Sequence, residues 1–222
     1  MNLTFGKRSA GLTLIEAMLI FAVVGVMAVI FLMPAVSRAR TRPPRVQCAN
    51  NLKEIGLSFQ IWEADNGDTY PMFISQTNGG TLEFSTGPNA WRHFQIMADE
   101  LMDPKLLICP ADKNGSRTVA TDFNLLSNSN LSYFVGMVSN ELSPQMILSG
   151  DCNVTNSLRL KNGVLALTKR YPAGWTADMH KTAGNILMGD GSVLQVDDSG
   201  LRAAVANSGV AENRVQMPVL EP

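Results

Sequence analysis

The chain has 222 residues, of which 45% are hydrophobic and 17% are charged. This length and composition fit one globular domain with an additional element, and they exclude two large domains and an intrinsically disordered chain. The formal net charge is −1, so the protein has no general positive field to hold nucleic acid, and we expect no nucleic-acid partner.

The N-terminal part of the chain combines a short basic segment with a long apolar run. Lys7 and Arg8 are the only charges in residues 1–11, and residues 17–36 contain no charge at all. A helix of 20 residues is about 30 Å long, which spans the hydrocarbon core of a bilayer. Three interpretations fit: a secretory signal cut after the run near Ser37, an uncleaved membrane anchor, and a leader cut before the run.

Glu16 lies just inside the start of the apolar run. A carboxylate at the centre of a membrane helix costs about 2.5–3.5 kcal/mol, and less near the end. Glu16 is therefore either a functional residue or a charge at the membrane interface, where the positive end of the helix dipole favours an anion. The two roles are compatible.

The residues from Lys7 to Glu16, with the apolar run that follows, resemble the class III signal of type IV pilins and type II secretion pseudopilins. In that family, prepilin peptidase cuts after a glycine on the cytoplasmic side, and the new N-terminal residue is methylated. The resemblance implies cleavage between Gly11 and Leu12, N-methylation of Leu12 and an assembly role for Glu16. Pro34 matches a helix-kinking proline of many pilins.

The assembly role has a physical basis. A newly exposed α-amino group is largely cationic at neutral pH. The Glu16 carboxylate of a neighbouring subunit can pair with it in an apolar bundle, where either charge alone is costly. The leader then lies in the cytoplasm, the chain crosses the inner membrane once, and the rest is periplasmic. Four arginines after the run oppose this orientation under the positive-inside rule: Arg38, Arg40, Arg42 and Arg45.

We divide the chain into four segments. Residues 1–11 are the leader, residues 12–36 the transmembrane and assembly helix, residues 37–66 a basic juxtamembrane segment with an amphipathic helix, and residues 67–222 the periplasmic head. The predicted fold class is α+β: a long N-terminal helical spine, transmembrane and then amphipathic, packs on a small antiparallel β-sheet head as in pilin-like proteins. The amphipathic helix presents one apolar face, made by Leu52, Ile55, Phe59 and Trp62.

The head sequence alternates short apolar runs with polar loops. Residues 71–90 and 111–130 are polar, so loops are expected there, with short strands in the first. Helices are predicted at 91–102 and 201–207, strands at 133–138, 146–149 and 164–168, and a hairpin at 185–188 and 192–196.

A second resemblance lies near the C-terminal end. His180, nine residues and then Asp190-Gly191 resemble the His-x9-Asp-Gly segment of pilin-like proteins from some environmental bacteria, and the sequences around Cys48 and Cys109 also match that group. One departure is Cys152, where arginine is expected. The resemblance implies architecture more than activity.

The three cysteines face an oxidising space if the head is exported. We favour a Cys48–Cys109 disulfide, which encloses about 60 residues and is worth about 3–4 kcal/mol in the chain-entropy model. Cys152 is then left over. The alternative is three reduced, buried thiols.

His180 and Asp190 are a metal or catalytic pair, or else a structural turn in which Asp190 and Gly191 form the turn and His180 braces it. We favour the turn. The chain has no P-loop, zinc-protease, EF-hand or nucleophile-elbow motif, so we expect no enzyme and no cofactor. Calcium is the better metal hypothesis, with hard oxygens at Asp151, Asp190, Asp197 and Asp198.

These observations predict a structural subunit of a pseudopilus or type IV pilus-like filament that supports type II protein secretion. The expected partners are prepilin peptidase, the inner membrane, other copies or related pseudopilins, and the secretion or pilus assembly platform. The alternative is a membrane-anchored periplasmic binding or enzymatic domain with an ordinary signal. The register of Gly11 and Glu16 favours the filament.

Overall fold

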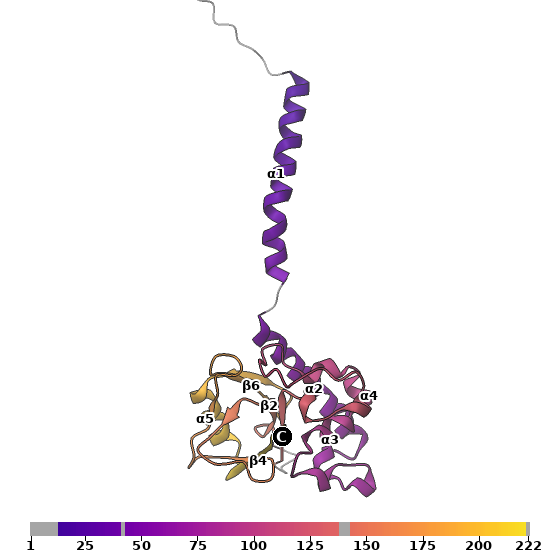
Figure 1. Cartoon of the computed structure of the whole chain (residues 1–222), viewed down its shortest axis with the longest axis vertical. Helices are drawn as coiled ribbons and strands as arrows, with labels where there is room; N and C mark the ends of the chain where they lie inside the picture. Colours follow the sequence, from indigo (N-terminus) through magenta and orange to yellow (C-terminus); the bar gives the residue numbers. More distant parts are fainter. Residues whose placement is uncertain (1–12, 41–42, 138–142, 221–222) are drawn as a thin grey trace, which may run out of the picture. The chain divides into compact units, whose positions relative to one another are not determined.

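The computed structural model describes residues 13–40, 43–137 and 143–220, with the side chains of residues 32–40 left out. The chain forms two units, Met1–Arg42 and Pro43–Pro222 (Figure 1).

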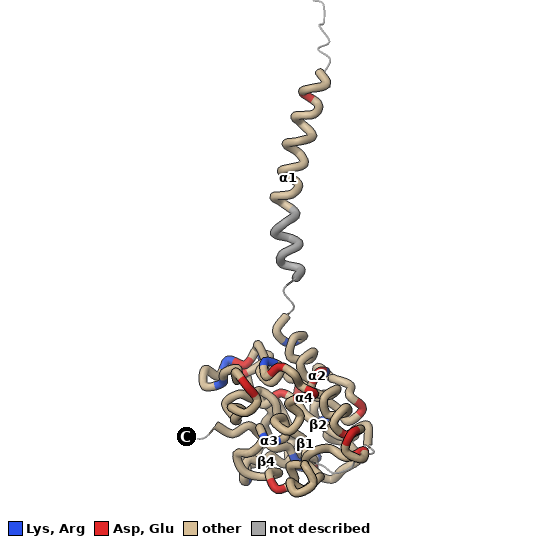
Figure 2. The backbone as a smooth tube through the Cα atoms, turned by 90° about the vertical axis from the view of Figure 1, so that its right-hand side faces the viewer, with Lys and Arg blue, Asp and Glu red and all other residues tan. Residues whose placement is uncertain are grey.

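The first unit holds one long helix, α1 (Leu14–Arg40). Within it, Leu14–Phe31 is apolar and long enough to cross a membrane, and none of this stretch is buried. Figure 2 shows acidic colour near the N-terminal end of α1, where the sequence has Glu16. No other helix of the described residues meets the same length and composition.

The second unit is built on a six-stranded antiparallel sheet. Its strands lie in the order β4 (Val164–Thr168), β8 (Glu212–Gln216), β1 (Tyr133–Gly136), β2 (Ile147–Asp151), β6 (Gly184–Met188) and β7 (Val193–Val196). The α+β fold class predicted from the sequence is confirmed by this sheet and the apolar helix that precedes it.

Both faces of the sheet are covered, which makes the central strands buried along their whole length. On one face, Tyr133 and Val135 join the core formed with α2 (Pro44–Asp65). On the other face, Phe134 joins a second core with α5 (Asp198–Asn207). A separate two-stranded antiparallel sheet, made by β3 (Val154–Thr155) and β5 (Gly174–Trp175), belongs to this second face. Figure 1 shows α2 and α5 on opposite sides of β2 and β6.

Helix α2 buries the face that the sequence predicts. Leu52, Ile55 and Phe59 are fully buried and Trp62 is 5% exposed. Pro44 stands at the first helical position, where its missing N–H breaks no hydrogen bond. The helix packs into the core of the second unit, so it is part of the head as well as a candidate spine.

The strands and the hairpin match the predicted positions within a few residues, and α5 includes the predicted helix at 201–207. The predicted helix at 91–102 is wrong as one element. It divides into α3 (Ala90–Gln95) and α4 (Ala98–Leu101). Residues 71–90 contain three 3-10 helices and no strand: Pro71–Phe73, Gln76–Asn78 and Leu82–Phe84. Three more lie at Pro104–Leu107, Phe123–Leu125 and Asn128–Asn130.

Candidate functional site

The first candidate site is the start of α1. Glu16 Oε2 accepts hydrogen bonds from the Thr13 N–H (3.2 Å) and hydroxyl (3.1 Å), and the Glu16 N–H donates to Thr13 Oγ1 (3.4 Å). This reciprocal pattern is a capping box, which satisfies backbone donors that the first turn leaves free. Glu16 therefore caps its own helix in the single chain. Gly11 and Leu12, the predicted cleavage residues, lie outside the described residues.

The second candidate site centres on a disulfide. Cys48, in the first turns of α2, is bonded to Cys109, which follows the 3-10 helix Pro104–Leu107. This is the pairing favoured from the sequence. Both residues are buried, at 0% and 1% exposure. The bond ties the helix to a segment 61 residues further along the chain.

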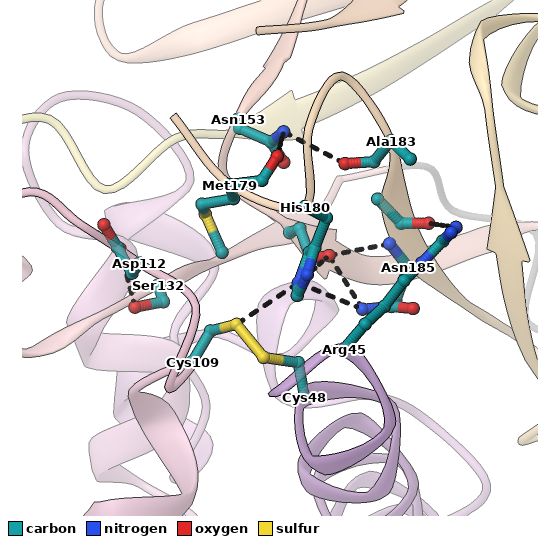
Figure 3. Close-up of polar contacts among 12 residues, drawn as sticks. Arg45, Cys48, Cys109, Asp112, Ser132, Asn153, Met179, His180, Ala183 and Asn185 are labelled. Carbon is teal, nitrogen blue, oxygen red and sulfur yellow. Dashed lines mark hydrogen bonds and ion pairs between the residues drawn. A yellow bond between two sulfur atoms is a disulfide. The ribbon is translucent and has the colours of Figure 1, made fainter. Parts of the chain in front are cut away.

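His180 lies directly on this disulfide (Figure 3). Its Nε2 atom is 3.3 Å from Cys109 Sγ and 3.3 Å from Asp151 Oδ2, and its side chain is 2% exposed. The amide of Asn185 donates to the same Asp151 oxygen at 2.9 Å, and its backbone N–H donates at 2.7 Å.

The Asp151 carboxylate is fully buried. Burial raises its pKa above the ordinary value, and the hydrogen bonds from His180 and Asn185 oppose that rise. Its second oxygen, Oδ1, is buried and has no hydrogen-bond partner among the described residues. An unpaired buried acceptor costs about 1–3 kcal/mol, so this oxygen lowers the stability of the fold.

The segment that carries His180 has an unusual backbone. Three consecutive non-glycine residues, His180, Lys181 and Thr182, have φ angles of 50°, 55° and 64°. Left-handed conformations disfavour L-residues and persist where the surroundings impose them. Asn153 supplies that support, because its Nδ2 lies within 3.0–3.2 Å of the carbonyls of Thr176, Met179 and Ala183.

The hairpin turn is formed by Asp190 and Gly191, as expected, but His180 does not brace it. Asp190 Oδ1 accepts the Ser192 N–H at 2.8 Å. Hydrogen bonding from the Ser192 side chain, and then from this N–H, lowers the pKa of the Asp190 carboxyl. Gly191 has a φ of 78°, a conformation that favours glycine. His180 contacts Asp151 and the disulfide instead. The sequence spacing placed it with Asp190, whereas the loop before β6 carries it back over β2.

The four aspartates named as calcium candidates do not form one cluster in the described part of the chain. Asp151 faces His180, and Asp190 closes the hairpin. Asp197 caps α5 by accepting the Gly200 N–H at 2.8 Å. Asp198 accepts the Trp175 N–H at 2.9 Å and pairs with Arg202. Each carboxylate is engaged in a different local structure.

A polar cavity of about 510 Å³ adjoins the second site. Cys152 and Met179 line it, with their sulfurs 3.9 Å apart, and so does the buried ion pair of Asp112 and Arg117 at 3.1 Å. Burial raises the pKa of the Cys152 thiol to about 12, so this third cysteine is a neutral thiol at physiological pH.

The second site is closed to a substrate. Cys48, Cys109 and Asp151 are buried, and Asp151 and Cys109 approach the same nitrogen of His180 instead of opposite sides of the ring. A catalytic relay needs the carboxylate on one ring nitrogen and the nucleophile on the other. The arrangement instead braces α2 against the sheet. Its cysteines, His180 and Asp151 stand out in the sequence, but Asn153 and Asn185 do not, because isolated amides carry no motif.

No protein-family model, curated protein or solved structure matches this chain.

Proposed function

We propose that this protein is a structural subunit of a pseudopilus or type IV pilus-like filament in support of type II protein secretion. The observation that carries the proposal is α1. Its stretch Leu14–Phe31 is apolar and unburied, with a single charged residue, Glu16, at its beginning. A helix of this kind requires an apolar environment outside its own chain, and a membrane followed by a helical bundle supplies one.

The proposal includes a leader cut between Gly11 and Leu12 by prepilin peptidase. N-terminal sequencing and intact mass of the membrane-extracted protein test it directly. We expect residues 12–222 with one added methyl group on the Leu12 amine. A start near Ser37 would favour the ordinary secretory signal, and an uncut chain the plain anchor.

The proposal also gives Glu16 a second role after cleavage. In the single chain Glu16 caps its own helix, and in the filament its carboxylate pairs with the Leu12 amine of a neighbour. The partners follow from this role: prepilin peptidase, the inner membrane, further subunits and an assembly platform.

Replacing the carboxylate separates assembly from insertion. Glu16→Leu makes the helix more apolar, so membrane insertion stays normal or improves. Crosslinking between subunits is lost or slowed, because the neighbouring amine is left unpaired in an apolar bundle. Glu16→Asp falls between the two. Asp99→Leu, at an exposed carboxylate of α4, is the matched control and leaves crosslinking unchanged. Normal assembly of Glu16→Leu would contradict the pairing.

The periplasmic position of the head draws support from two contacts. The Cys48–Cys109 disulfide fits an oxidising compartment. Arg45, one of the four arginines that oppose the orientation, donates to the carbonyls of Gly184 and Val196 at 3.2 and 3.1 Å. These contacts hold the Arg45 side chain, with its charge, against the sheet of the folded head instead of leaving it free for lipid headgroups.

A further inference from the structure

We propose that the second site is also a zinc site: when the disulfide is reduced, Cys48, Cys109 and His180 bind Zn²⁺, with Asp151 as the fourth ligand. The proposal stands on the geometry of the head alone and does not depend on the filament role.

The donor atoms already lie close enough to share one ion. The two sulfurs and a ring nitrogen of His180 are all within 4.8 Å of one another. Asp151 Oδ2 is 3.3 Å from His180 Nε2. In a tetrahedral zinc site with Zn–S bonds of about 2.3 Å and Zn–N bonds of about 2.0 Å, neighbouring ligand atoms are about 3.3–3.8 Å apart. Reduction breaks the S–S bond, so the two sulfurs can separate to this distance, and the Asp151 carboxylate, which lies beside His180, has to approach the sulfurs to complete the set.

The donor types select zinc. Two thiolates, an imidazole and a carboxylate offer a mixed sulfur, nitrogen and oxygen set, and tetrahedral sites rich in sulfur favour zinc over magnesium or calcium. The site is closed, with its ligand side chains at most 2% exposed. This closure is typical of structural zinc sites, in which protein atoms fill all four positions.

The buried Asp151 carboxylate is an independent indication of a missing ligand. Its Oδ1 atom has no partner in the described structure, and the residue is 0% exposed. A divalent ion beside this carboxylate compensates the charge that burial penalises. An ion bound through Oδ1 would give this oxygen a partner, while Oδ2 keeps its two hydrogen bonds from Asn185.

The surrounding contacts are those that orient metal ligands. Asn185 fixes Asp151 through two hydrogen bonds, at 2.7 and 2.9 Å. Asn153 fixes the left-handed segment that presents His180 to the sulfurs. Hydrogen-bond partners of this kind hold the metal-binding side chains in place, and their loss typically lowers metal affinity about 10–100-fold.

Zinc binding follows reduction of the disulfide in a second step. A dithiol reductant gives two electrons and two protons to the disulfide and leaves as its own disulfide, so Cys48 and Cys109 become thiols. Zn²⁺ then displaces the two thiol protons to water, and His180 binds as a neutral imidazole through Nε2 with its proton on Nδ1. Two Zn–S bonds, one Zn–N bond and one Zn–O bond to Asp151 form. One cross-link replaces another, so α2 stays tied to Cys109 in either redox state.

Cobalt titration of the full-length protein in detergent micelles tests the site. The protein is reduced with a phosphine, and Co²⁺ is added with its absorption spectrum recorded. We expect the visible bands of tetrahedral cobalt and a thiolate-to-cobalt charge-transfer band, saturating at one ion per chain and lost on addition of Zn²⁺. The oxidised protein gives neither band.

Variants decide which residues bind. Cys109→Ser and His180→Gln weaken Co²⁺ binding by at least about 10-fold, and Asp151→Asn shifts the visible bands. Cys152→Ser is the matched control and leaves the spectrum unchanged. Circular dichroism of each variant reports whether the head is folded, and the reduced and oxidised forms of the parent protein need no substitution. Absence of tetrahedral bands in the reduced parent, or bands that depend on Cys152 and not on His180, would overturn the proposal.

Discussion

The two units of this protein differ in where their apolar side chains lie. In α1, large apolar side chains are exposed, with Phe21 at 78% and Val24 at 59%. In the second unit, a helix of similar length buries Leu52, Ile55 and Phe59 completely against a sheet. Burial of apolar surface is the main favourable term in folding. The head gains this free energy within its own core, whereas α1 can gain it only from an apolar environment outside its own chain.

The polar groups follow the same division. The charged side chain in the apolar stretch of α1, Glu16, is bonded within its own first turn. In the head, buried polar residues are linked across long stretches of sequence: His93 with Gln216, and Asp151 with His180 and Asn185. The head is thus stabilised from within, whereas α1 depends on surroundings. Substitutions that are alike in chemistry but differ in unit therefore test the comparison.

The largest effect is expected at the centre of α2. Phe59 is fully buried, with ring contacts to Tyr70 at 5.9 Å and Phe94 at 6.2 Å. Phe59→Ala removes this packing and leaves a cavity, so the free energy of unfolding of the head falls by about 3–5 kcal/mol. Leu57→Ala, on the exposed side of the same helix, changes it by less than about 0.5 kcal/mol. Chemical denaturation in detergent measures both, and equal losses would refute the burial argument.

The disulfide comes next. Cys48→Ser with Cys109→Ser removes a cross-link between positions 61 residues apart, and the unfolding free energy falls by about 3–4 kcal/mol. The measurement is denaturation with a metal chelator present, so that no ion replaces the bond. Cys152→Ser costs less, because no cross-link is lost. A double variant as stable as the parent would show that the bond does not constrain the unfolded chain.

The sequence predicted local patterns and missed the partners that distant segments supply. The buried face of α2 has an apolar period of its own, and so do most of the strands. Strand β8 (Glu212–Gln216) escaped prediction because it is polar, yet it lies between β4 and β1. Gln216 is buried there through hydrogen bonds to His93 and to the carbonyls of Phe84 and Gly87. No periodicity reports a strand stabilised in this way.

In the candidate site, too, one contact was predicted from the sequence and another was missed. The cysteine pair was open to prediction because three cysteines offer few pairings. His180 was assigned to the Asp190 turn by sequence spacing, whereas its partner is Asp151. The pairing of β2 with β6, with Gly150 opposite Ile186, places Asp151 beside Asn185. Only the tertiary register makes that contact, so sequence spacing alone did not give it.

The pH dependence of stability is a smaller effect and arises in the head. His93 is fully buried between Thr81 and Gln216, and burial lowers its pKa to about 4. The unfolded chain, with an ordinary histidine, binds more protons below pH 6.5 than the folded one does. The free energy of unfolding therefore falls as the pH falls through 6.5 towards 4, by about 2 kcal/mol between pH 7 and pH 5.

Unfolding measured across this pH range tests the assignment to His93. His93→Gln keeps a polar group in the same place but does not titrate, so its stability varies less with pH by about that amount. The comparison uses the slope with pH and not the absolute stability, which the substitution also changes. An unchanged slope in His93→Gln would assign the pH dependence to another group.

The smallest effect on the head is expected in α1, and it tests the comparison most directly. Val24→Ala and Val135→Ala remove the same two methyl groups, the first from an exposed helix position and the second from the buried strand β1. Val135→Ala lowers the unfolding free energy of the head by about 2 kcal/mol. Val24→Ala changes this free energy by less than about 0.5 kcal/mol, because Val24 is not buried and its truncation removes no core packing. The order reverses in crosslinking of assembled subunits, where the apolar surface of α1 is the proposed contact and only Val24→Ala weakens the yield. Loss of head stability in Val24→Ala equal to that in Val135→Ala would mean that the head depends on α1, and the two units would no longer be energetically separate.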